Sequence, residues 1–378
     1  MTQTEPIKVG VLYSETGVTS AIESSQLYAT LFAIREINDA GGIDGREVVP
    51  IRYDPQSDPV RYRALAERLI LEDDVPVIFG CYMSSTRKAV LPIVERWNRL
   101  LFYATLYEGF EFSENLIYTG AAPNQNSVQL ANFMTSQFGP RVYMVGSNYI
   151  YPYESNRIMS DLVMQRPGGA KLGERYVRLG ATEDDFADVI EDIGKTRPDF
   201  IFSTVVGSAT QHFYRAYARA GFDPTTMPIA SLTTSEVEVA QMGAEIACGH
   251  ITAAPYFRSI GSDANYACVE KFAQAFGPEV IPNASWEAAY FQVHLMARAM
   301  RAAGSADIEA LMPKLLGSEF DAPQGRVRVD ASTHHTWLHP RIGRVDRRGE
   351  FTIEQEAGAA VRPDPYLVAH ALGDWSAR

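Results

Sequence analysis

The 378-residue sequence predicts an α/β fold made of two lobes, each a doubly wound parallel sheet. Short apolar runs alternate with amphipathic helical patterns along most of the chain, which is typical of βα units and parallel strands. Three segments, near residues 121, 255 and 332, are expected to be crossings between lobes, and the length suits two or three domains. We therefore expect one lobe from residues 1–121 and 255–332, and a second from residues 122–254 and 333–378.

The chain begins with a series of strand-and-helix units. Leu27, Leu31 and Ile34 recur at helical spacing, and this helix is expected to end at Gly41–Gly42. Pro59 fits the first turn of the next helix, 59–72, because no N–H group is needed there. The expected strands of this part are 7–13, 47–53, 77–79, 100–103 and 116–119.

One stretch, Val77–Val90, combines a buried strand, a glycine turn and a helix start. Gly80 allows the turn, and Ser84, Ser85 and Thr86 are residue types that cap helix N-termini. A helix start can hold a small polar group, and ligands of open α/β sheets bind outside the carboxyl ends of the strands. The stretch therefore predicts either one wall of a ligand site or an ordinary capped helix.

The same alternation continues after Ala121–Ser127. Tyr149, Tyr151 and Tyr153 are expected in a strand-to-helix loop, where core packing explains aromatic residues less readily. Residues 337–353 are expected to form a hairpin around Asp346–Gly349. The other expected strands are 141–146, 172–179, 199–204, 228–232, 250–254 and 326–329, and the other expected helices are 127–138, 184–194, 209–220, 266–276, 285–303 and 306–316.

Composition and charge restrict the partners. The net charge of −12 argues against direct nucleic-acid binding and against anionic membrane surfaces. The sequence has no apolar run long enough to cross a membrane, and residues 1–6 lack the features of a secretory signal, so we expect a cytoplasmic protein. Three cysteines without metal-ligand spacing indicate free thiols, and we expect neither a metal nor a cofactor.

Two segments, Val9–Gly17 and Glu36–Arg46, carry recognisable motifs. They resemble the type I periplasmic-binding-protein family, whose members bind branched-chain amino acids, amides or urea. Other blocks are similar to the AmiC-like amide sensors of this family, which restrain expression of an amidase operon. These blocks are Gly80–Ser84, Thr86–Val90, Tyr107–Glu111, Ala122–Ser127, Tyr149–Pro152, Glu154–Asn156, Phe202–Gly207, Ser231–Glu236, Asp321–Gly325, Arg362–Tyr366 and Gly373–Ser376.

The resemblance implies a fold and a function. It covers nearly the whole chain and implies a three-strand hinge with a ligand cleft between the two lobes. It also implies a cytoplasmic sensor that binds a small neutral aliphatic amide and controls an RNA-binding antiterminator partner. The alternative is the substrate-binding component of an ABC transporter for urea, short amides or branched-chain amino acids.

The expected ligand site contains hydroxyl groups and aromatic rings, because a neutral amide needs hydrogen-bond partners and no charge partner. Ser84 and Thr105 follow neighbouring strands of the first lobe, so their hydroxyls can converge. The resemblance matches six positions to the amide pocket, which are Tyr82, Ser84, Tyr103, Thr105, Tyr149 and Tyr151. Thr204, Val205 and Thr233 are weaker candidates from the second lobe.

Alternatives remain open at several of these positions. Tyr82 and Tyr103 can be core packing, and Thr233 can cap the helix expected near Ser235. Leu106 stands where the amide sensors have proline, which changes the expected ligand size. An amino-acid ligand would need a buried carboxylate for its ammonium group, since an unpaired buried charge is costly, and the candidates are Glu236 and Glu287.

We found no catalytic sequence motif that would indicate an enzyme. The sequence contains no nucleophile elbow, phosphate-binding loop or metalloprotease motif. We expect His334–His335 on a solvated turn and Cys81 as a packed thiol. The chain is therefore expected to be a binding protein and not an enzyme, and the apolar-striped helix 285–303 would permit a homodimer.

Overall fold

The computed structural model describes residues 5–370, which divide into two compact units. Unit 1 comprises the described residues up to Leu106, together with Glu111–Gly120 and Gly261–Leu338. Unit 2 comprises Tyr107–Phe110, Ala121–Ile260 and the described residues from His339 onward. The expected sequence block Gly373–Ser376 lies outside the described residues.

Two of the unit boundaries lie about six residues beyond the expected positions 255 and 332, at Ile260 and Leu338. Phe257 stays in unit 2 because its ring packs on that of Phe351, with the ring centroids 4.8 Å apart. Thr336 stays in unit 1 because it pairs with Val329 in an antiparallel ladder. Side-chain packing and strand pairing, which local sequence patterns do not encode, set these boundaries.

The sheet of unit 1 has five parallel strands in the order β2-β1-β3-β4-β5. Residues of β3 and β4 are fully buried, as continuous apolar runs predict for parallel strands covered on both faces. Since β3 and β4 are neighbours, the segments that follow them leave the sheet side by side at its carboxyl edge. The strands are β1 (Ile7–Leu12), β2 (Val48–Arg52), β3 (Val77–Gly80), β4 (Leu100–Tyr103) and β5 (Leu116–Tyr118).

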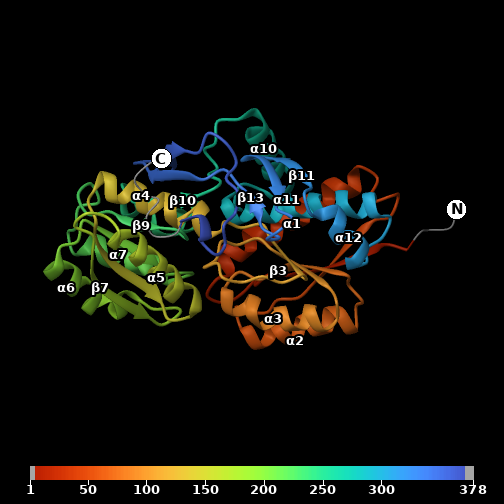
Figure 1. The fold of residues 1–378 in the computed structure, drawn as a ribbon, viewed down its shortest axis with the longest axis horizontal. Helices are drawn as coiled ribbons and strands as arrows, with labels where there is room; N and C mark the ends of the chain where they lie inside the picture. The colour runs from red at the N-terminus through yellow and green to blue at the C-terminus, as the bar shows by residue number, and fades with distance from the viewer. Residues whose placement is uncertain (1–4, 371–378) are drawn as a thin grey trace. The chain divides into compact units, whose positions relative to one another are not determined.

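Helices cover this sheet. In unit 1, α2 and α3 lie side by side along the strands, and α1 packs along α11 (Figure 1). The helices are α1 (Ser20–Asp39), α2 (Pro59–Leu71), α3 (Ser84–Arg96), α10 (Asp263–Phe276), α11 (Ala284–Ala303) and α12 (Ile308–Leu315). A small antiparallel sheet completes the unit, with strands β11 (Glu319–Ala322), β12 (Gly325–Val329) and β13 (Thr336–Trp337).

Helix α11 forms part of the core of unit 1. Its Trp286 stacks on Tyr290, and Tyr290 stacks on Phe32 of α1, with ring centroids 5.8 and 5.6 Å apart. Thirteen residues of α11 are buried inside the unit. The apolar stripe that was expected to permit a homodimer is therefore used for internal packing.

The sheet of unit 2 has seven strands in the order β15-β14-β10-β9-β8-β6-β7. The five strands from β10 to β7 are parallel, whereas β14 and β15 form an antiparallel hairpin at one edge. This confirms the predicted hairpin, although Trp337 belongs to the small sheet of unit 1. The strands are β6 (Arg141–Ser147), β7 (Ala170–Val177), β8 (Phe200–Thr204), β9 (Ile229–Ser231), β10 (Ile251–Ala254), β14 (Arg341–Val345) and β15 (Phe351–Glu356).

Three helices of unit 2 match the predicted helices 127–138, 184–194 and 209–220, whereas the helix at 150–164 begins within a segment that was expected to be a loop. Figure 1 shows α5, α6 and α7 beside the strands of this unit. The helices of unit 2 are α4 (Ser127–Gln137), α5 (Ile150–Met164), α6 (Ala187–Thr196), α7 (Ala209–Arg219), α8 (Glu236–Met242) and α9 (Ala244–Ala247), with short 3₁₀ turns η1 (Pro123–Gln125), η2 (Glu183–Phe186) and η3 (Val368–His370). Within residues 5–370, none of the helices is both long and apolar enough to cross a membrane.

The structure corrects the expected position of His334–His335. His335 is fully buried, and its ring stacks on that of Tyr118 with centroids 4.0 Å apart. Burial lowers the pKa of His335 to about 3, so the imidazole is neutral at ordinary pH. The pair of histidines looks polar in the sequence, but a neutral imidazole can pack as an aromatic ring.

Candidate functional site

Ser84 lies at the carboxyl edge of the unit 1 sheet, at the start of α3. Met83, and not a hydroxyl residue, occupies the N-cap position, and Ser84 is the first residue of the helix. The expected cap by Ser84, Ser85 or Thr86 is therefore not formed, and the Thr86 hydroxyl donates to the Met83 carbonyl oxygen at 2.8 Å. Ser84 is 1% exposed, and its Oγ accepts a hydrogen bond from Nη1 of Arg87 at 3.2 Å.

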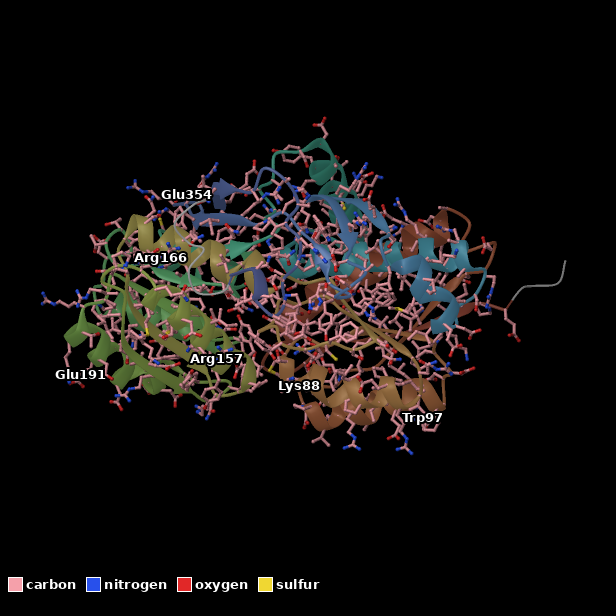
Figure 2. All side chains as sticks on the ribbon, viewed as in Figure 1. Lys88, Trp97, Arg157, Arg166, Glu191 and Glu354 are labelled. Carbon is pink, nitrogen blue, oxygen red and sulfur yellow. The ribbon has the colours of Figure 1, made fainter. Side chains whose placement is uncertain are left out.

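Arg87 lies beside the candidate residue Ser84, although it was not among the site residues expected from the sequence. Its side chain is fully buried, lies over the ring of Tyr103 at 4.7 Å, and donates from Nε to Glu111 at 2.7 Å. Burial tends to raise the pKa of Glu111, but Arg87 and then Lys88 lower it to about 2. Figure 2 shows Lys88 on α3, toward the opposite end of the helix from Trp97. The guanidinium charge at this edge is thus neutralised within unit 1.

A hydrogen bond joins the two candidate tyrosines of unit 1, Tyr82 and Tyr103. The Tyr103 hydroxyl donates to the Tyr82 carbonyl oxygen at 2.6 Å, and both side chains are buried. These contacts give Tyr103 a packing role beside Ser84 and Arg87, as the alternative interpretation proposed. They also fix the backbone that leads from β3 into α3.

Thr105 follows β4 and is 5% exposed. Its Oγ1 accepts from Nε2 of Gln26 at 3.0 Å, and the same nitrogen donates to the Ala104 carbonyl oxygen at 3.3 Å. Gly120 lies directly against this segment, because a Cβ atom there would be 2.0 Å from the Thr105 carbonyl carbon. Gln26 and Gly120 therefore position Thr105, and neither was identified in the sequence.

Tyr149 and Tyr151 lie after β6 at the carboxyl edge of the unit 2 sheet. Tyr149 lies in the strand-to-helix connection as expected, at the N-cap position of α5, whereas Tyr151 and Tyr153 lie within the helix. Tyr149 is half-buried and Tyr151 is buried, and their ring centroids are 6.2 Å apart. The proline at 152 falls in the first turn of the helix, where it requires no partner, so it does not mark the end of a loop.

The other unit 2 candidates lie at the same edge. The Thr204 hydroxyl donates to Asn156 at 2.9 Å, so its hydrogen is used inside the unit, and the side chain of Val205 is buried. Thr233 donates to the Val205 carbonyl oxygen at 3.2 Å. Ser235, and not Thr233, caps α8 by accepting from Val237 N–H.

The two candidate carboxylates have different surroundings. Glu287 is buried in α11 and accepts from Gln324 Nε2 at 2.6 Å, which gives it a structural role. Glu236 is half-buried at the start of α8, after β9, and accepts from Arg258 N–H at 2.8 Å. Burial raises the pKa of Glu236 to about 7, so it carries only part of a negative charge at neutral pH.

Two further expectations from the sequence concern the Cys81 thiol and the binding of metal ions. Cys81 is buried, and burial raises the pKa of its thiol far above the ordinary range, which makes it an unreactive packed residue. Across residues 5–370, no cluster of three histidine, cysteine, aspartate or glutamate side chains is arranged to hold a metal ion.

Comparisons with known proteins agree with this architecture. Residues 7–371 match the family described as "Periplasmic binding protein domain". A Brucella melitensis protein named "Leu/Ile/Val-binding protein homolog 6" is 24% identical over 336 residues, covering 87% of this chain and 85% of that protein. A Pseudomonas aeruginosa "leucine-, isoleucine-, valine-, threonine-, and alanine-binding protein" is 23% identical and covers 86% of each chain.

Solved structures show the same fold. An ABC-transporter solute-binding protein of Rhodopseudomonas palustris, in complex with p-hydroxybenzoic acid, matches with a TM-score of 0.87 and 20% identity, covering 97% of this chain and 100% of that one. The isoleucine complex of LivJ from Streptococcus pneumoniae matches with a TM-score of 0.80 and 18% identity, covering 95% and 100%. The fold and the family match together show that this chain belongs to the periplasmic binding protein family, whose members bind ligands and are not enzymes.

Proposed function

We propose that this protein binds a small solute through hydroxyl groups at the carboxyl ends of its strands, as a receptor of the kind that serves ABC transporters. The observation that carries the proposal is the placement of Ser84 and Thr105 after the neighbouring strands β3 and β4, each held by a buried hydrogen-bond donor. Relatives named as Leu/Ile/Val-binding proteins support the receptor role. Tyr149 and Tyr151, at the carboxyl edge of the unit 2 sheet, are proposed as ligand contacts on the resemblance alone.

The finer proposal is that the solute is a small neutral aliphatic amide or urea. The charge of Arg87 is neutralised by Glu111, so this edge of unit 1 offers hydroxyl groups rather than a cation for a ligand carboxylate. A neutral carbonyl group matches hydroxyl donors without the desolvation cost of a buried charge. The resemblance of several sequence blocks to those of amide sensors supports the same ligand class.

A branched-chain amino acid is the second candidate, and the names of the relatives favour it. Its ammonium group would require a carboxylate, for which Glu236 at the carboxyl edge of unit 2 is the candidate. The raised pKa of Glu236, about 7, fits a carboxylate that would gain a cation on binding.

Calorimetric titration separates these ligands. We expect heat from acetamide, propionamide or urea, and none from leucine or 4-hydroxybenzoate. Ser84→Ala should weaken amide binding by about 1 kcal/mol, the usual value of one hydrogen bond, while the control Ser136→Ala, near the far end of α4, should not change it. If leucine binds and no amide does, and if Glu236→Gln abolishes the leucine binding, then the ligand is an amino acid and not an amide.

A cytoplasmic sensor role is a further proposal that rests on the resemblance alone. The sensor would hold an antiterminator-type RNA-binding protein inactive until the amide binds. Copurification from the native host with and without acetamide tests it. A partner that is released by acetamide supports sensing, whereas recovery of the protein from the periplasmic fraction supports transport.

A further inference from the structure

Gln26 is a fully buried side chain of α1 that contacts Thr105 from the side of the core. Its Nε2 donates to Oγ1 of Thr105 at 3.0 Å and to the Ala104 carbonyl oxygen at 3.3 Å. The carbonyl oxygen can only accept, so it fixes which end of the Gln26 amide faces this segment. If the amide were turned over, two acceptor oxygens would face each other.

The remaining atom of the amide does not help to hold the side chain in place. Gln26 Oε1 is buried and has no hydrogen-bond partner among residues 5–370. An unsatisfied buried acceptor is costly, and most buried polar atoms in proteins are paired. The side chain therefore keeps its orientation because of the two contacts made by Nε2, and not because of any bond to Oε1.

This orientation decides what the Thr105 hydroxyl can offer. A hydroxyl has one hydrogen, and its oxygen is already an acceptor for Gln26. Within residues 5–370, no protein atom accepts the Thr105 hydrogen, and the residue retains 5% exposure. The Thr105 hydroxyl is therefore available as a donor.

We propose that Gln26 is a positioning residue that holds the Thr105 hydroxyl as a hydrogen-bond donor to the ligand, so that the ligand group at Thr105 is a carbonyl oxygen. The inference rests on the proposed function and narrows its ligand class. Acetamide and urea present such an oxygen. Acetamidinium has a similar size and shape but carries only N–H donors, so the site should reject it.

A double-mutant cycle tests the coupling, with acetamide as the probe. Gln26→Leu and Thr105→Val should each weaken acetamide binding by about tenfold, and the double variant should be no weaker than the poorer single variant. Thr105→Ser should retain binding, and Gln274→Leu, the same change at a glutamine on α10, should have no effect. Additive losses, or an unchanged affinity in Gln26→Leu, would overturn the inference. Wild-type binding of acetamidinium within tenfold of acetamide would also overturn it.

An NMR measurement keeps the test independent of any ligand. In ¹⁵N-labelled protein, the Gln26 side-chain amide signal should move in Thr105→Val and stay in place in Thr105→Ser. If it stays in place in both, Gln26 does not donate to Thr105 and the inference is wrong. If the signal moves but no amide or urea binds the wild type, the proposed ligand fails and the assignment of Thr105 as a donor stands.

Discussion

A buried ion pair joins Arg87 and Glu111 at the carboxyl edge of the unit 1 sheet. We predict that Arg87→Leu lowers the free energy of unfolding by about 3 kcal/mol, because it leaves a buried carboxylate without its main partner. Urea denaturation measures the loss.

Two controls isolate that mechanism. Arg87→Leu combined with Glu111→Leu should recover part of the stability, since no buried charge remains. Arg157→Leu, which breaks half-exposed pairs with Glu154 and Asp161, should cost less than about 1 kcal/mol. If the double variant is as unstable as the sum of the two single variants, charge burial is not the cause.

His250 gives a prediction about pH. Its Nδ1 accepts from Ile229 N–H at 2.9 Å, and burial lowers its pKa to about 3 from the ordinary 6.5. At pH values between about 3 and 6.5, the unfolded chain therefore binds a proton at His250 that the folded chain does not bind. Stability should fall as the pH drops from about 6.5 toward 3, by up to about 1.4 kcal/mol per pH unit for this group.

Denaturation curves at several pH values test this prediction against a variant that does not titrate. His250→Asn keeps an acceptor atom near Ile229 but cannot gain the proton. The stability of this variant should depend less steeply on pH than that of the wild type. Part of the remaining pH dependence comes from His335, whose pKa is also about 3. Equal slopes for both proteins would contradict the assignment.

At the scale of elements, two glycines are expected to respond in opposite directions. Gly120→Ala would place a Cβ atom 2.0 Å from the Thr105 carbonyl carbon, so we predict lower stability and weaker ligand binding together. Gly194 lies exposed in α6, and a Cβ there meets nothing closer than 3.7 Å. Gly194→Ala should raise stability by about 0.5–1 kcal/mol with ligand affinity unchanged. Thermal melts and calorimetry check both, and a Gly120→Ala variant with unchanged stability would show that the close approach of Gly120 to Thr105 does not matter.

Helix α5 shows why one element was misassigned. The run Tyr149–Tyr153 contains a proline and three aromatic residues, a composition that suggests a loop. The helix nevertheless begins there, because proline is accepted in a first helical turn and Tyr151 packs in the core. Tertiary burial outweighed the local preference.

At the scale of the whole molecule, the β14–β15 hairpin completes the sheet of unit 2 with residues from the far end of the chain. Phe351 of this hairpin is 3% exposed and packs on Phe257. We predict that Phe351→Ala costs about 3 kcal/mol and lowers hydrogen-exchange protection more in unit 2 than in unit 1. An equal loss in both units would show that they unfold as one.

The sequence by itself determined the α/β class, the order of nearly all strands and helices, and the edge at which the candidate residues lie. These properties depend on hydrophobic periodicity and turn residues, which are local features. Only the tertiary structure decided which groups hold the candidate hydroxyls. Gln26 meets Thr105 across 79 residues and Arg87 meets Glu111 across 24, and no local pattern encodes such contacts. Long-range packing sets the direction of each hydrogen bond, and that direction decides the ligand chemistry that we propose for Thr105.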